Sequence, residues 1–169
     1  HNNRVDGCER GNWFYFTLQY RILSAMEQAG YSWKGVFAAM DDNIIIRAFA
    51  PNDKQLITAF FDQMGEETRA FFDRGGCNRV TAMKYFDGTA ENTDYFLAEQ
   101  DGTMCGYVFL KEMCRSIPWL GIAVAEELKG KGLGRRLLQY AAEHARQKEK
   151  GGILLITHPD NLRAQRLYE

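Results

Sequence analysis

Apolar and polar positions along the chain follow two different periods. A stripe of apolar side chains recurs every four residues from Leu133 to Ala145, which predicts a helix that begins near Gly132. The runs 119–124 before this helix and 153–156 after it are short and apolar, so each is typical of a buried strand. This part of the chain is therefore predicted to run strand, loop, helix, strand.

From residue 43 onward the pattern predicts further elements. They are a strand over 43–50, a helix over 51–64, a second helix over 66–74, and the two strands of a hairpin over 95–99 and 106–111. The hairpin is indicated by Asp101-Gly102, a turn dipeptide between two β-rich runs. Strands and helices thus alternate along one domain of ordinary size.

The N-terminal part has a different pattern. Apolar residues spaced from Phe14 to Ala29 predict a helix that stops at Gly30, a residue typical of helix C-termini. Residues 31–42 follow as a connector. We therefore divide the chain into an N-terminal helical extension with its connector, 1–42, and a domain over 43–169.

Composition excludes several classes of protein. The chain has 169 residues, enough for a core without disulfides, and a formal net charge of −1, which implies no bulk attraction to nucleic acid or membranes. Its apolar runs are too short to cross a bilayer, and no signal peptide precedes them, so a cytoplasmic protein is expected. Four cysteines and three histidines show no metal-ligand spacing, so no metal is expected.

The segment 129–136 carries three alternate glycines and four cations where a strand meets a helix. The first N–H groups of a helix lack intrahelical partners, and glycines let an anion approach them, which predicts a phosphate site. A solvated basic turn is the alternative. A Walker loop is excluded because no Ser or Thr follows a Gly-Lys pair, and a dinucleotide fingerprint is disfavoured because Arg135 stands where its third glycine belongs.

Two motifs together resemble a known family. The loop reads Lys129-x-x-Gly132-x-Gly134, and the chain later reads Asn161, Ala164 and then Leu-Tyr-Glu at its end. This order is similar to that of the GCN5-related N-acetyltransferase (GNAT) family, which usually has Arg or Gln where Lys129 stands. The resemblance implies the acyl-CoA N-acyltransferase fold, an α/β structure of the α+β type with a mixed, centrally splayed sheet flanked by helices.

The resemblance also marks two departures from the family. The predicted N-terminal helix is an addition, and the C-terminus is apparently incomplete, because the family usually continues past Leu-Tyr-Glu into two more strands. Since the N-terminal forty residues are helical in pattern, they are not expected to take the place of those strands.

The family's functional residues can be carried over to matching positions. The residues expected to bind acetyl-CoA as cosubstrate are Ile122, Ala123, Val124, Lys129, Gly130, Lys131, Gly132, Leu133, Gly134, Arg135 and Asn161. Tyr168 is expected near the sulfur, as a hydrogen-bond donor to the departing thiolate. Roles as a helix N-cap for Asn161 and as a core side chain for Tyr168 are open alternatives. Glu112 and Glu99 both lie on strands predicted near 119–124, and Glu112 is the residue expected to act as the general base.

The implied activity is the transfer of an acetyl group from CoA to a primary amine by direct attack in a ternary complex. The acceptor is a small-molecule amine or a protein N-terminus, since the mixed charges of residues 56–86 select neither. A non-catalytic acyl-CoA sensor or partner module of the same fold is the main alternative. A nucleic-acid-binding domain is disfavoured by the near-neutral charge, and a homodimer is left open.

Overall fold

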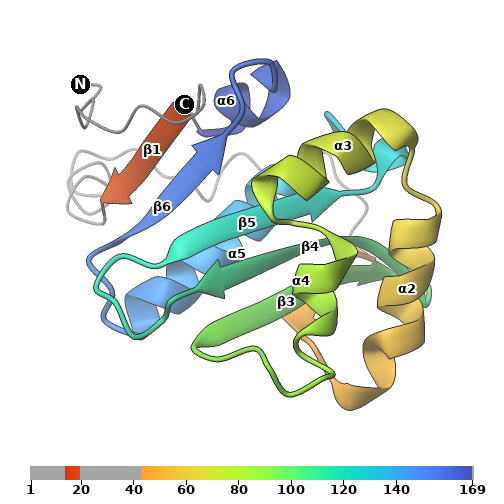
Figure 1. Ribbon diagram of the computed structural model, residues 1–169, viewed down its shortest axis with the longest axis horizontal. Helices are drawn as coiled ribbons and strands as arrows, with labels where there is room; N and C mark the ends of the chain where they lie inside the picture. Colours follow the sequence, from red (N-terminus) through yellow and green to blue (C-terminus); the bar gives the residue numbers. More distant parts are fainter. Residues whose placement is uncertain (1–13, 20–42, 169) are drawn as a thin grey trace.

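The computed structural model describes residues 14–19 and 43–168 as one sheet with helices on both faces (Figure 1). The strands are β1 Phe14–Gln19, β2 Ile45–Ala48, β3 Thr93–Gln100, β4 Thr103–Lys111, β5 Trp119–Val124 and β6 Gly152–Thr157. The helices are η2 Pro51–Asp53, α2 Lys54–Asp62, α3 Glu66–Gly75, α4 Arg79–Met83, η3 Glu126–Leu128, α5 Leu133–Gln147 and α6 Leu162–Tyr168.

The sheet is mixed, with the strand order β1-β6-β5-β4-β3-β2. The pairs β2–β3, β3–β4 and β4–β5 are antiparallel, β5 and β6 are parallel, and β1 is antiparallel to β6. Helix α5 crosses from β5 to β6, because parallel neighbours need a long connection. The mixed sheet and the helices that flank it are as the sequence predicts, although the short helix α4 was not foreseen.

The central strand β4 is buried on both faces. Val108 and Leu110 pack with Leu137 of α5, whereas Tyr107 and Phe109 pack on the opposite face, in the cluster that contains α2. Helices α2, α3 and α4 lie on that second side of the sheet in Figure 1, and α5 lies behind it. Two-sided burial explains why the sequence of β4 shows an apolar run rather than strict alternation.

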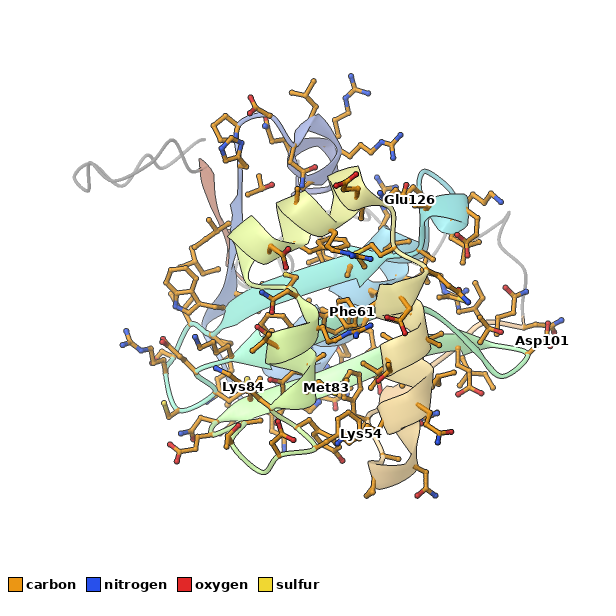
Figure 2. The ribbon with its side chains drawn as sticks, turned by 45° about the vertical axis from the view of Figure 1, so that its right-hand side comes forward. Lys54, Phe61, Met83, Lys84, Asp101 and Glu126 are labelled. Atoms are coloured by element: carbon orange, nitrogen blue, oxygen red, sulfur yellow. The ribbon has the colours of Figure 1, made fainter. Side chains whose placement is uncertain are left out.

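An aromatic cluster fills the space between the sheet and helices α2 and α4. Phe61 of α2 contacts Tyr107 edge-on, with ring centroids 5.7 Å apart, and lies beside its helix in Figure 2. Three hydroxyls in the cluster donate to backbone carbonyls: Tyr85 to Phe49 at 2.9 Å, Tyr95 to Thr81 at 2.9 Å and Tyr107 to Cys77 at 2.5 Å. Burial raises the pKa of Tyr95 to about 12 and that of Tyr107 well above its usual range, so both stay neutral.

A network of charged side chains lies at the β2 edge of the sheet. The Asp53 carboxylate accepts two hydrogen bonds from Arg47, at 2.7 and 2.8 Å, and a third from the Ala50 backbone at 2.6 Å. Arg47 also donates to Glu99 of β3 at 2.7 Å. The bond to Arg47 lowers the pKa of Asp53, so this nearly buried carboxylate is ionised at neutral pH. Glu99, the other acid considered as a base, is thus held by Arg47.

The N-terminal prediction is wrong where the structure describes it. Residues Phe14–Gln19 form strand β1 instead of the first turns of a helix, and β1 pairs antiparallel with β6 from Phe14↔Thr157 to Gln19↔Gly152. The segment therefore does take a place in the sheet, contrary to expectation. The other residues of the expected helix and its connector lie outside the described part. The division of the chain at residues 42 and 43 stays a prediction.

Candidate functional site

The sheet opens between β5 and β6. These two strands pair only at Trp119↔Leu154 and Leu120↔Leu155, at the beginning of β5. In the described part of the chain, residues 121–124 have no strand partner on that side. A cleft of about 1720 Å³ includes this free edge of β5 and the C-terminal end of β6. The predicted central splay is confirmed.

Gly121 stands at the point where the two strands separate. A Cβ atom at this position would lie 2.3 Å from the Phe109 ring and 2.6 Å from the Cys77 Sγ, closer than real Cβ contacts. The close approach of Phe109 and Cys77 to the backbone therefore requires glycine here. Both side chains line the cleft.

The register of β5 decides which of its backbone groups face the cleft. Ala125 N–H donates to Cys105 O at 2.8 Å, so every second residue back along β5, including Ala123, directs its backbone groups to β4. Ile122 and Val124 direct theirs to the free edge, and both line the cleft. Ala123 has a buried side chain and does not line the cleft.

The loop between β5 and α5 presents backbone donors to the same cleft. Gly130 and Gly132 have φ angles of 78° and 90°, in the left-handed region that favours glycine. Gly132 is the N-cap of α5, and among the described residues no side chain caps this helix. The first N–H groups of α5, at residues 133–135, therefore lack intrahelical acceptors at the positive end of the helix dipole. The Leu133 side chain itself is buried in the core.

The four cations of the loop have different environments. Lys129 Nζ donates to Glu126 Oε1 at 2.6 Å and to Thr68 Oγ1 at 2.5 Å. Arg136 donates to the backbone carbonyl of residue 44 at 3.0 Å. Lys131 and Arg135 are exposed, line the cleft, and form no ion pair within the part of the chain that the structure describes. The cations free to meet an anion are therefore Lys131 and Arg135.

Helix α6 forms another wall of the cleft. Asn161 Oδ1 accepts a hydrogen bond from Ala164 N–H at 3.1 Å, so Asn161 caps this helix and also lines the cleft. A Cβ atom at Gly134 would lie 3.2 Å from Leu167 Cδ2, which shows that α5 and α6 pack closely at this glycine. Tyr168 is the last residue of α6, and its side chain lies outside the described part.

Glu112 lines the opposite end of the cleft. It follows β4 directly, with a positive φ of 61°, so it stands in a turn and not on a strand as expected. Its Oε2 lies 2.7 Å from Arg115 Nε. The cleft is also lined by residues for which no motif gave a signal: Phe72, Cys77, Thr81, Lys84 and Trp119.

The described residues hold no group of three or more His, Cys, Asp or Glu side chains placed to bind a metal ion. Cys77 and Cys105 are buried and Cys114 is exposed, and these three cysteines form no disulfide among the described residues. Burial raises the pKa of the Cys77 thiol to about 12, so it is neutral and a poor nucleophile. No helix among residues 14–19 and 43–168 is long and apolar enough to span a bilayer.

Comparison with protein families identifies the chain. The model of the acetyltransferase (GNAT) family matches residues 56–169, and the protein belongs to this family. Its members are acetyltransferases, which agrees with a cleft that presents backbone groups of a splayed strand and a helix N-terminus. A comparison with curated protein sequences found no match.

Solved structures of similar fold include acetyltransferases. A GNAT-family acetyltransferase from Streptococcus pneumoniae is 25% identical, with a TM-score of 0.60, over 74% of this chain and 80% of its own. The yncA protein of Salmonella typhimurium, solved with acetyl-CoA, is 19% identical (TM-score 0.56, 75% and 76% covered). The spermidine N-acetyltransferase of Vibrio cholerae, in complex with CoA and spermine, is 19% identical (TM-score 0.57, 76% and 79% covered).

Proposed function

We propose that this protein transfers the acetyl group of acetyl-CoA to a primary amine by direct attack in a ternary complex. One observation carries the proposal: a single cleft contains the free edge of β5 and the uncapped N-terminus of α5. The first can pair with an extended ligand, and the second can bind a phosphate. A long ligand with amide groups at one end and a pyrophosphate at the other, as CoA has, satisfies both.

The cosubstrate would be held mainly by backbone groups. The pyrophosphate accepts from the N–H groups of residues 133–135, with the side chains of Lys131 and Arg135 adding charge. The pantetheine arm lies along Ile122 and Val124 like an added strand. The thioester then lies near Gly121, where Ile122 N–H can stabilise the oxyanion, an effect worth about 3 kcal/mol per donor.

The remaining groups would bind the pantetheine arm, stabilise the departing thiolate and deprotonate the amine. Tyr168 donates a hydrogen bond to the departing thiolate, but because a tyrosine pKa near 10 exceeds a thiol pKa near 8.5, full proton transfer to a stable thiolate is unfavourable. Asn161 offers its amide N–H groups to the arm while its oxygen caps α6. Glu112 serves as the general base for the amine, a role worth roughly 10²- to 10⁴-fold in rate. Glu112→Gln tests this role, since it should remove an ionisation from the pH profile of kcat/KM.

The acceptor would enter at the end of the cleft away from the loop, between α3, α4 and the start of β5. Aromatic and polar side chains line this end, including Phe72, Thr81 and Trp119. A small-molecule amine is the first choice of acceptor and a protein N-terminus the second. The preference for a small-molecule amine is supported by two proteins of similar structure, a spermidine N-acetyltransferase and the aminoglycoside acetyltransferase AAC(6')-Ib.

Two measurements test the function. Acetyl-CoA should raise the melting temperature of the protein, because a ligand that binds only the folded state stabilises it. Release of free CoA should then depend on an amine from a panel of polyamines, aminoglycosides and peptides. No shift with any acyl-CoA would reject the proposal, whereas a shift without CoA release from any amine would favour a non-catalytic sensor of the same fold.

A further inference from the structure

Lys129 occupies the first position of the loop pattern, and its ammonium is already bound by two side chains of the protein. Two of its three N–H groups are used by Glu126 Oε1 and Thr68 Oγ1, at 2.6 and 2.5 Å. Only 21% of the Lys129 side chain is exposed, and Thr68 is buried. The carboxylate of Glu126 neutralises the positive charge of Lys129, which therefore attracts a phosphate less strongly.

These contacts join two walls of the cleft. Thr68 belongs to α3, Glu126 belongs to η3, and Lys129 follows η3 at the start of the loop. A Cβ atom at Gly65, the N-cap of α3, would lie 3.7 Å from Glu126 Oε1, and Figure 2 shows Glu126 beside this end of the helix. A carboxylate near a helix N-terminus is itself favourable.

Helix α3 has a second polar anchor at its other side, where Arg69 donates to the backbone carbonyls of Met64 at 3.2 Å and Phe61 at 3.4 Å. Among the α3 side chains that the structure describes, Thr68 is the one that is fully buried, and Phe72 is half-buried. Both line the cleft, so a shift of α3 would change the shape of its acceptor end. Arg69 holds α3 to the end of α2, whereas the contact of Thr68 with Lys129 links α3 to the loop.

We propose that Lys129 is a positioning residue that ties α3 to the loop, and that it does not bind the pyrophosphate. The proposal rests on the proposed function, because it assigns the tie to the acceptor side of that site. Loss of the Lys129 ammonium or of the Thr68 hydroxyl should loosen α3 in the same way. Both losses should raise the KM for the amine about five-fold and change the affinity for acetyl-CoA little.

The first experiment measures acetyl-CoA affinity and its dependence on salt. Lys129→Met and Thr68→Val should each change the dissociation constant by less than about two-fold and leave its salt dependence as in the wild type. Lys131→Met, which removes an exposed loop cation, should weaken binding and reduce the salt dependence. If Lys129→Met weakens binding more than about ten-fold and reduces the salt dependence while Thr68→Val does neither, the proposal is overturned.

The second experiment measures amide hydrogen exchange over residues 66–75 without any ligand. Exchange should rise in Lys129→Met and Thr68→Val, rise no further in the double variant, and stay unchanged in Lys131→Met and in Thr68→Ser, which keeps the hydroxyl. Unchanged exchange in both main variants contradicts the tie. A wild-type protein that fails to bind acetyl-CoA would instead reject the proposed function, and the exchange result would still decide whether the tie exists.

Discussion

The two halves of the sheet differ in how their polar groups are used. In the half formed by β2, β3 and β4, the buried tyrosine hydroxyls donate to carbonyls and Asp53 is paired with Arg47. In the half formed by β5 and β6, the strands separate after two paired residues, and backbone groups at the free edge and at the start of α5 have no strand or cap to pair with in the described chain. The polar groups named in the first half are paired within the protein, whereas those named in the second remain open to a ligand.

This difference assigns separate tasks to the halves. A packed core with satisfied polar groups stabilises the fold, because an unpaired buried donor or acceptor costs about 1 to 3 kcal/mol. Unpaired backbone groups in an open cleft cost less, since water reaches them, and they remain available for binding. Substitutions in the first half should therefore change stability, and substitutions in the second should change ligand affinity.

The largest effect is expected for Phe61→Ala in the packed half. Removing this buried ring from its contacts with Phe60 and Tyr107 should lower the free energy of unfolding by about 4 kcal/mol. Urea denaturation measures the loss, and Phe61→Leu should lose clearly less because it leaves a smaller cavity. A loss below about 1 kcal/mol would show that this half is not the rigid part of the molecule.

Gly132→Asp should have the next largest effect, on binding. The new carboxylate would stand at the N-terminus of α5, so acetyl-CoA affinity should fall by at least about 100-fold, or about 3 kcal/mol. Gly132→Asn is the matched control, because Asn and Asp both tolerate a positive φ and differ in charge. Calorimetric titration should show the large loss only for Asp. Equal losses in both variants would mean that backbone strain, and not an anion site, explains the effect.

Asp53→Asn should lower the free energy of unfolding by about 2 kcal/mol at pH 7, because hydrogen bonds to a charged group are lost. Since Arg47 lowers the pKa of Asp53 below its ordinary 3.8, the stabilisation is complete above that pH and is lost as the pH falls through the lower folded value. Denaturation curves of both proteins should therefore converge in acid. A difference that persists unchanged at pH 2 would contradict the role of the ion pair.

The smallest effect is expected for Asn161→Ser, which separates two roles of one residue. A serine hydroxyl can still cap α6, so the melting temperature should stay close to that of the wild type. Loss of the amide donors should weaken acetyl-CoA binding about five-fold, or about 1 kcal/mol. Asn161→Ala should lower both stability and affinity. If affinity is unchanged in Asn161→Ser, the residue serves only as a cap.

Much of the fold could be predicted because local patterns and tertiary packing agree. The strand 119–124 and the helix after Gly132 appear as expected, since a buried strand and an amphipathic helix leave distinct periods in the sequence. Residues 14–19 were misjudged because Phe14 and Leu18 fit both a helical stripe and a strand alternation. Pairing with β6, a partner distant in sequence, selects the strand.

The candidate site could be predicted less completely, because motifs name residues but not their partners. The glycine loop and the edge of β5 line one cleft, as the two motifs together suggested. Lys129 was expected to bind the cosubstrate, which stays a prediction, and the structure adds that Glu126 and Thr68 bind its ammonium. Thr68 is distant in sequence, so no local pattern could reveal this contact.

The sequence by itself determined the order of strands and helices from residue 43 onward except for the short helix α4, the glycines at the start of α5, and the family. These properties depend on local periodicity and on backbone conformations that glycine alone adopts easily. Only the tertiary structure decided that β1 pairs with β6, that β5 exposes Ile122 and Val124 rather than Ala123, and which cations remain free. These depend on which distant segments meet, because hydrogen bonds and ion pairs form between neighbours in space.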